Sequence, residues 1–230
     1  MSDPASEYKL QAAEAALGLV ESGMTLGLGT GSTAAFVISG LAERLRDGRL
    51  QDVSGVPTSE QTAAQARAAG IQLVELTEAG VDLAIDGCDE VDADLNLIKG
   101  LGGALTREKL VAVAARRFVI VADASKRVGR LGELAPVPVE VLQFGLAATL
   151  GRLSLLVDSL EMRRTPTGES LVSDNGNLIV DVTPRADFEP HELAEDLKAE
   201  TGVVEHGLFL QLTDLAILAG PEGITRLTYP

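Results

Sequence analysis

Apolar runs rich in β-branched residues alternate with amphipathic helical patterns along the first half of the chain. Apolar residues at helical spacing, Leu10, Ala13, Leu17 and Val20, predict an amphipathic helix near the start of the chain. Thr58 and Gln61 stand in the positions of a capping box and predict the start of a later Ala-rich helix. The strand-like runs lie at 24–28, 53–57, 71–76, 81–85 and 118–122. This alternation predicts an α/β fold with a Rossmann-like, mostly parallel sheet and helices on both faces.

The pattern changes near Pro136. Residues 137–142 read as a strand and 146–157 as a helix, and 169–182 as two strands around a turn at Asn175 and Gly176. A helix over 191–200 and a strand over 202–207 complete a β-α-β-β-α-β order, which is that of a split βαβ unit. We therefore expect an inserted small α+β domain at 132–206 within a larger domain formed by 1–131 and 207–230. The apolar run at 207–220 is expected to rejoin the first sheet.

The charge balance excludes some classes of partner. The chain has 34 acidic and 19 basic residues, a net charge of −15, and 46% of its residues are hydrophobic. The apolar fraction predicts a folded protein, and the acidic surplus argues against nucleic-acid or membrane-surface binding. An anionic ligand would have to be held by a few local cations and backbone amides.

Cysteine use and the chain start bear on the compartment. Cys88 is the only cysteine, so neither an intrachain disulfide nor a thiolate zinc site is expected. The first residues lack the pattern of a secretory signal, and no apolar run approaches the roughly 18 residues that a membrane span needs. We expect a cytoplasmic protein.

Three segments follow predicted parallel strands: GTGST at 29–33, DGCD at 86–89 and DASK at 123–126. Ligands of open α/β sheets bind at the carboxyl ends of the strands, so these segments are expected to meet in one crevice. In the first segment, free helix amides and the Ser32 and Thr33 hydroxyls could cradle a phosphate, although an ordinary tight turn would look the same. Ser32 stands where a dinucleotide-binding loop would have its third glycine, which disfavours a dinucleotide.

The acidic cluster that begins at Asp86 does not match a metal site. Leu97 replaces the glycine of a calcium loop that would start at Asp92, and both histidines fall in the presumed small domain. A solvated acidic turn explains Glu90, Asp92 and Asp94 better than it explains Asp86 and Asp89, which lie closest to the strand end. Cys88 is read as a small packing residue and not as a nucleophile.

A glycine-rich loop comes next, with Lys99 before it and Glu108 after it. Glycines at 100, 102 and 103 allow backbone N–H groups to face a ligand, to which Lys99 would add a cation. Glu108 falls in the first turn of a helix predicted over 106–116. It is either a partner of the helix dipole or a general base that the same dipole keeps ionised.

The segments GLGTGSTAAF, DGCDEVDADLNLIKG, GGALTREK and VADASK, in this order, resemble the ribose-5-phosphate isomerases of the A type. The likeness covers essentially the whole chain, and DGxDE followed by KGxGxALxRE is its specific part. It implies interconversion of ribose 5-phosphate and ribulose 5-phosphate in the non-oxidative pentose phosphate pathway, without a metal or an organic cofactor. It also implies a small-molecule sugar phosphate as partner and a homodimer or tetramer.

Carried over by position, the resemblance makes Glu108 the catalytic base. It implies that the substrate is bound by Thr30, Gly31, Ser32, Thr33, Asp86, Gly87, Cys88, Asp89, Lys99, Gly100, Leu101, Gly102 and Lys126. Leu101 departs from the pattern, since many members have another glycine there. Lys99 and the loop amides would stabilise a cis-enediolate, Asp86 or Asp89 would open the sugar ring, and Lys126 with Lys9 would neutralise the phosphate.

Other functions fit the sequence less well. A sugar-phosphate sensor of a transcriptional regulator would need a basic helix-turn-helix, which this acidic chain lacks. An amino-sugar-phosphate deaminase on a similar fold would need a histidine near the site. A coenzyme A transferase would use a glutamate as nucleophile, and a thioester on Glu108 would reveal it.

Overall fold

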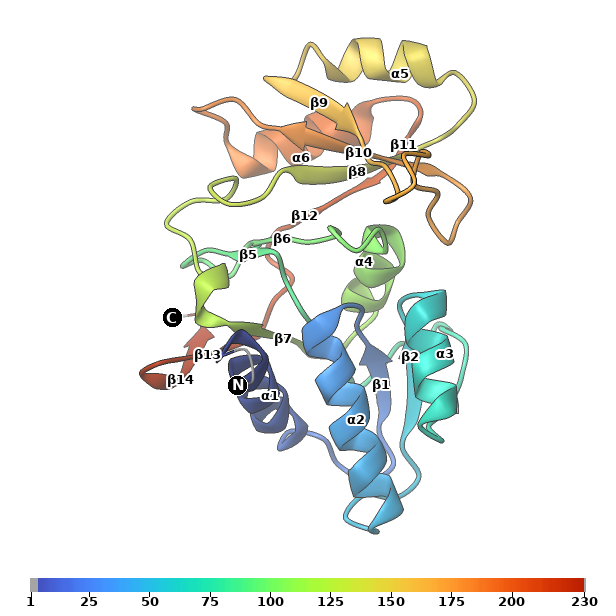
Figure 1. Ribbon diagram of the computed structural model, residues 1–230, viewed down its shortest axis with the longest axis vertical. Helices are drawn as coiled ribbons and strands as arrows, with labels where there is room; N and C mark the ends of the chain where they lie inside the picture. Colours follow the sequence, from blue (N-terminus) through green and yellow to red (C-terminus); the bar gives the residue numbers. More distant parts are fainter. Residues whose placement is uncertain (1–3, 230) are drawn as a thin grey trace.

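The computed structural model describes residues 4–229, which form a large sheet, a smaller sheet and a short three-stranded sheet between them (Figure 1). The large sheet has seven strands in the order β14-β13-β7-β4-β1-β2-β3. Their bounds are β1 (Thr25–Leu28), β2 (Ser54–Pro57), β3 (Gln72–Leu73), β4 (Leu83–Asp86), β7 (Phe118–Asp123), β13 (Leu215–Gly220) and β14 (Gly223–Thr228). All neighbours pair in parallel except β13 and β14. The predicted mostly parallel sheet is confirmed.

Both faces of the large sheet are covered. Helices α1 (Pro4–Leu17), α2 (Ser32–Arg46) and α3 (Glu60–Ala68) share a core with one face, into which Val119 and Val121 of β7 point. Helix α4 (Leu105–Val113) packs on the other face with Phe118 and Ile120. The three-stranded sheet lies on this second face and contains β5 (Glu90–Val91), β6 (Leu97–Ile98) and β12 (Leu208–Phe209). In residues 4–229, no helix has the length and apolar character to cross a membrane.

The second sheet has four antiparallel strands in the order β11-β8-β10-β9. The elements follow as β8 (Val137–Val141), α5 (Leu146–Leu153), β9 (Ser159–Met162), β10 (Leu178–Thr183), α6 (Pro190–Ala199) and β11 (Val203–His206). This is the β-α-β-β-α-β order expected for a split βαβ unit. The sheet buries Val137, Val139 and Val141 of its second strand.

Several local expectations were wrong. The strand before the Asn175-Gly176 turn is absent from the described structure, because 169–173 makes only isolated bridges and β10 pairs with the earlier β9. The expected helix over 146–157 ends at Leu153. Ser59, not Thr58, caps α3, accepting the Thr62 N–H at 3.0 Å. Strand β14 and the three-stranded sheet were not expected. The strands of the three-stranded sheet have two residues each, and runs of that length carry no readable period.

Glu90 of β5 ties the three-stranded sheet to the segment that leads into the second sheet, and it is not the solvated residue that the acidic run suggested. Its side chain is fully buried and accepts backbone N–H groups from Gly132, Leu134 and Ala135, where the chain enters the second sheet. The core of that sheet also includes Ile98 and Leu208 of the three-stranded sheet. The division into 1–131 with 207–230 and 132–206 stays a prediction, and residues 1–3 and 230 lie outside the described residues.

Candidate active site

A cavity of about 150 Å³ opens at the carboxyl ends of β1, β4 and β7. The three segments expected to converge do meet here. The lining residues are Lys9, Thr30, Gly31, Ser32, Thr33, Gly87, Cys88, Asp89, Lys99, Gly100, Gly102, Glu108, Ala122, Asp123 and Lys126. Parallel strands bring these segments together at one edge of the sheet, although residues 33 and 123 are 90 positions apart in the sequence.

One buried ammonium group lies between two buried carboxylates. Lys99 Nζ is 3.1 Å from Asp86 Oδ2 and 3.3 Å from Glu108 Oε1, and it also donates to the Gly87 carbonyl. The three side chains are only 2 to 5% exposed. The group carries two potential negative charges against one positive charge, so the full ionisation of both carboxylates is disfavoured.

Burial raises the pKa of Glu108 to about 8, although Lys99 opposes the rise. Burial also raises the pKa of Asp86, while Lys99 and the N–H groups of Thr30 and Gly87 act against it. Burial alone would lower the pKa of Lys99, but the two carboxylates raise it, so the ammonium stays charged. Glu108 accepts fewer hydrogen bonds than Asp86, so hydrogen bonds stabilise its ionised form less.

The second carboxylate oxygen of Glu108 is free. Oε2 is buried and has no hydrogen-bond partner within residues 4–229, and the side chain lines the cavity. A buried oxygen without a partner is costly in a folded protein. Here it is placed to accept a proton from a bound molecule.

The opposite part of the cavity is suited to an anion. Helix α2 begins with Ser32 and Thr33 in the cavity wall, where the first amides of a helix have no partner within the helix. Gly31 before it has φ of 108°, a conformation that favours glycine. Lys9 Nζ donates to Ser32 Oγ at 3.1 Å, and Lys126 reaches the wall from the turn after β7.

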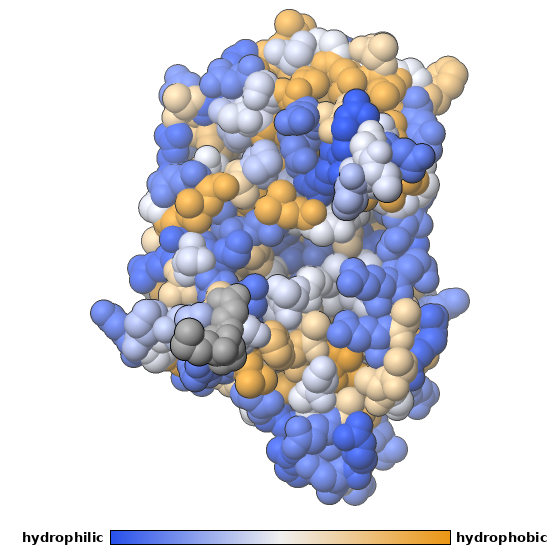
Figure 2. Space-filling view, in the orientation of Figure 1, coloured by the Kyte–Doolittle hydropathy of each residue, from blue (hydrophilic) through white to orange (hydrophobic). Residues whose placement is uncertain are grey.

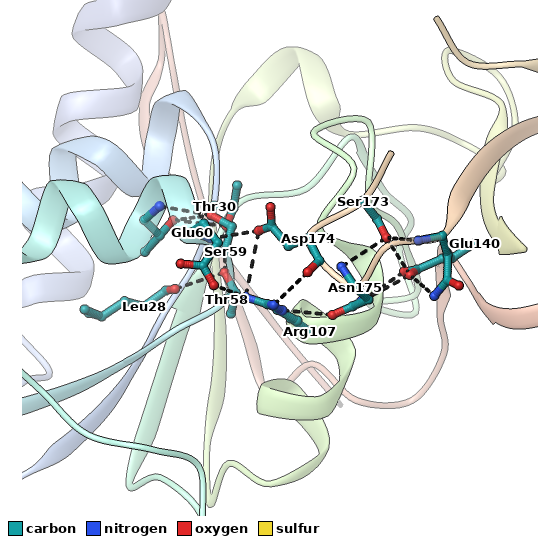
Figure 3. A network of polar contacts seen from close by, with 12 residues as sticks. Leu28, Thr30, Thr58, Ser59, Glu60, Arg107, Glu140, Ser173, Asp174 and Asn175 are labelled. Carbon is teal, nitrogen blue, oxygen red and sulfur yellow. Dashed lines mark hydrogen bonds and ion pairs between the residues drawn. The ribbon is translucent and has the colours of Figure 1, made fainter. Parts of the chain in front are cut away.

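Thr30 connects the cavity to a polar network that ends in the second sheet (Figure 3). Its Oγ1 contacts the hydroxyls of Thr58, Ser59 and Thr62 at 2.7 to 3.1 Å. Glu60, the first residue of α3, donates its N–H to the Asp174 carboxylate at 2.8 Å, and this bond ties the start of the helix to the loop that precedes β10.

Arg107 and Glu140 continue this network. Arg107 donates to Glu60, to the Asp174 carbonyl and to Asn175 Oδ1 at 2.9 to 3.0 Å. Asn175 in turn donates to the buried carboxylate of Glu140 on β8. Arg107 immediately precedes Glu108 on α4, so the network supports the segment that carries the free carboxylate oxygen.

The remaining expected residues differ in their placement. Asp86 lies beneath the cavity and contacts it through Lys99, whereas Asp89 is in the wall. The Leu101 side chain is 42% exposed and outside the cavity, but its N–H donates to Asp89 Oδ2 at 3.0 Å. The Cys88 thiol has a pKa raised to about 12 by burial, which fits a packing residue.

Two residues of the site were missed. Ala122 lines the cavity beside Asp123, and its place at the end of β7 could have identified it. Arg163 immediately follows β9 and binds the glycine loop, which is about 60 residues away in the sequence, so no local pattern predicts the contact. In the part of the chain that the structure describes, no group of three His, Cys, Asp or Glu residues could hold a metal ion.

Comparisons with known proteins show which family this chain resembles. A family model described as ribose 5-phosphate isomerase A (phosphoriboisomerase A) matches residues 54–223. The chain is 55% identical to ribose-5-phosphate isomerase A of Roseiflexus sp. (strain RS-1), over 97% of this chain and 96% of the relative. It is 44% identical to that of Deinococcus radiodurans, over 96% and 97%.

Solved structures give the same result. A D-ribose-5-phosphate isomerase in complex with phospho-erythronic acid superposes with a TM-score of 0.93 at 38% identity, covering 99% of this chain and 100% of that one. Ribose 5-phosphate isomerase from Plasmodium falciparum superposes with a TM-score of 0.92 at 38% identity, covering 97% and 98%.

Proposed function

The chain belongs to the ribose 5-phosphate isomerase A family, and from this premise we propose how its residues interconvert ribose 5-phosphate and ribulose 5-phosphate. The enzyme is an aldose–ketose isomerase, and the pentose phosphate pathway is its expected context. The observation that carries the assignment of roles is the free, buried Oε2 of Glu108 in the cavity wall beside Lys99.

Glu108 is the general base. Its carboxylate takes the proton from C2 of the open-chain aldose and later returns it to C1, while a proton moves from O2 to O1. The electron pair of the broken C2–H bond forms the C1–C2 double bond of a cis-enediolate. Collapse of that enediolate with protonation at C1 leaves the C2 carbonyl of the ketose.

Lys99 and the glycine loop stabilise the enediolate. The charge that develops on O1 and O2 needs fixed donors in a site that excludes water. The Lys99 ammonium is buried in the wall, and the backbone of Gly100 and Gly102 lines the same cavity. These groups are in place before the reaction, which supports their role. Catalysis without a metal or an organic cofactor stays a prediction from the resemblance.

Asp89 is the residue that opens the sugar ring. Of the two candidate carboxylates, Asp89 lines the cavity, whereas Asp86 is held beneath it by Lys99 and two backbone N–H groups. We assign to Asp86 the role of keeping the Lys99 ammonium in position. The phosphate lies at the start of α2 on Ser32 and Thr33, with Lys9 and Lys126 supplying positive charge.

The homodimer or tetramer that the resemblance implies is also a proposal. Large apolar side chains are exposed in the part of the chain around the second sheet, including Leu134, Phe144 and Leu155 at 64, 94 and 71%. Figure 2 shows apolar residues gathered at the end of the molecule that carries α5. A mass in solution of one chain would contradict the dimer. The cytoplasmic location stays a prediction.

The isomerase activity is tested by incubating EDTA-treated protein with ribose 5-phosphate in D₂O and following the sugars by NMR. We expect ribulose 5-phosphate to form and to contain deuterium at C1, because the proton on Glu108 exchanges with solvent. A folded protein that binds the sugar phosphate without converting it would overturn the proposal.

A further inference from the structure

We propose that Arg163, on the second sheet, is a positioning residue that orients the backbone N–H groups of the glycine loop toward the reacting atoms. This inference rests on the isomerase function proposed above and extends it to a residue outside the cavity wall. It also gives the second sheet a part in the chemistry.

Arg163 binds two consecutive peptide carbonyls of the loop. Its Nη1 donates to the Gly100 carbonyl at 2.7 Å and to the Leu101 carbonyl at 2.9 Å. The Gly100 carbonyl also accepts the Gly103 N–H at 2.9 Å, whereas Arg163 is the partner given by the structure for the Leu101 carbonyl. The side chain is only 12% exposed, which strengthens these charge-assisted bonds.

The guanidinium is itself held in place. Its Nε donates to Asp181 Oδ2 at 2.8 Å and its Nη2 donates to Asp181 Oδ1, so the residue that follows β9 is paired with a residue of the neighbouring strand β10. Asp181 therefore binds one edge of the planar group, and Nη1 contacts the loop. A guanidinium held in this way has little freedom to follow movements of the loop backbone.

The contacts set the direction of two N–H groups. In a trans peptide the C=O and the N–H point in opposite directions, so a carbonyl held toward Arg163 turns the following N–H away from it. The Leu101 N–H indeed donates to Asp89 in the cavity wall. The Gly102 N–H has no partner within residues 4–229, and Gly102 lines the cavity. It is therefore available to an enediolate oxygen.

The loop needs such a restraint from outside. Gly100 has φ of 102° and Gly103 has φ of 81°, and glycines in a loop have many alternative conformations. Leu101 exposes its side chain and does not anchor the segment. The positive charge at the carbonyl end also polarises each peptide and strengthens its N–H as a donor.

The test compares Arg163→Gln with Arg164→Gln, because the Arg164 side chain is exposed and, within residues 4–229, bonds only to the nearby Gly168 carbonyl. We expect Arg163→Gln to lower kcat about 10- to 100-fold, with KM changed less than about threefold, since one fixed donor typically contributes about 100-fold or more. Arg163→Lys should recover part of the loss, and Arg164→Gln should match the wild type.

Binding of two inhibitors separates positioning from general damage. Phospho-erythronic acid has a planar carboxylate with charge on two oxygens, as the enediolate has, while erythritol 4-phosphate lacks that group. Arg163→Gln should weaken the acid about tenfold and leave the alcohol unchanged. Equal weakening of both ligands, or a wild-type kcat, would overturn the inference.

Two further outcomes are distinguishable. If Arg163→Gln does not fold, Asp181→Asn provides the test, because it releases the Arg163 guanidinium from its carboxylate partner. This variant should also bind phospho-erythronic acid more weakly, to a smaller degree, and bind erythritol 4-phosphate as the wild type does. Its failure to do so would overturn the inference. A wild-type protein without isomerase activity would refute the proposed function, whereas an active wild type with an equally active Arg163→Gln would refute only the role of Arg163.

Discussion

Among single residues, the chemistry depends on Lys99 and the two carboxylates that share it. Its ammonium is 3.1 Å from Asp86 and 3.3 Å from Glu108, all three being buried. The pair of carboxylates keeps the lysine charged, and the lysine limits how far burial raises the pKa of Glu108. The result is a base whose pKa of about 8 lies near the pH at which it must both accept and return a proton.

This pKa predicts the pH profile of the free enzyme. A general base acts in its ionised form, so kcat/KM should rise about tenfold per pH unit below pH 8 and level off above it. The substrate phosphate titrates near pH 6, so the two events can be told apart. The profile is measured with initial rates at low ribose 5-phosphate. A rate that is already constant above pH 6 would contradict the pKa given to Glu108.

Replacing Lys99 should move the same profile. The ammonium favours the ionised form of Glu108, so Lys99→Met should shift the rising limb to a pH above 8 and lower the plateau by about 100-fold or more. Circular dichroism controls for the fold. A limb that stays near pH 8 in the folded variant would show that Lys99 does not set the pKa of Glu108.

The sequence indicated many of the site residues but not their supports. Thr30 to Thr33, Asp89 and Lys126 could be predicted because each follows a buried apolar run. Glu108 was open between a dipole partner and a base, and its burial with a free oxygen depends on packing that no pattern encodes. Arg163 was out of reach, because its contacts join segments about 60 residues apart.

At the scale of secondary-structure elements, the parallel strands bring the site together and the loops hold it. The inner strands of the large sheet, such as β7, were predictable because their residues are apolar on both faces, whereas the exposed edge strand β14 was not. The segment before β10 was not predictable either, since Ser173 and Asp174 use their polar groups to bind Glu140, Arg107 and Glu60. The turn at Asn175-Gly176 forms, but the chain before it makes only isolated bridges and β10 pairs with β9 instead.

Glu140 should be a main support of that loop. Its fully buried carboxylate accepts hydrogen bonds from Ser173, Asn175, Asn177 and Thr106. Glu140→Gln would turn an N–H₂ group toward these donors, so we expect the free energy of unfolding to fall by about 2–4 kcal/mol. Urea titration measures it.

The matched control is Glu161→Gln on β9 of the same sheet, whose side chain is exposed. It should change the free energy of unfolding by less than about 0.5 kcal/mol. Equal stability of the Glu140 and Glu161 variants would refute the structural role of Glu140.

For the whole molecule, the two larger sheets form one connected structure. Ile98 and Leu208 belong to the short sheet between them yet pack into the core of the four-stranded sheet. Arg163 and Arg107 add polar contacts from each side to the loops at the site. The molecule as a whole is acidic, with a net charge of −15, so its overall field does not attract a phosphate. Binding of the phosphate therefore depends on two lysines of the cavity, Lys9 and Lys126.

We expect this connection to make unfolding cooperative. Loss of circular dichroism and loss of isomerase activity should coincide in urea, with equal calorimetric and van't Hoff enthalpies. Residues 132–206 unfolding at a lower urea concentration than the rest would contradict this and would instead support an independent inserted domain.

The central claim is that Glu108 moves the proton between C2 and C1, and kcat of Glu108→Gln tests it most directly. The variant keeps the shape of the side chain but cannot accept the proton. It also removes a buried carboxylate, so at pH 9 it should melt at or above the wild-type temperature. The control is Glu195→Gln, since Glu195 is an exposed glutamate on α6.

The measurement follows ribulose 5-phosphate formation by the EDTA-treated variants at saturating ribose 5-phosphate. We predict that Glu108→Gln loses about 100- to 10,000-fold in kcat while Glu195→Gln matches the wild type. A folded Glu108→Gln protein with full activity would contradict the account and would assign the proton transfer to another group of the cavity.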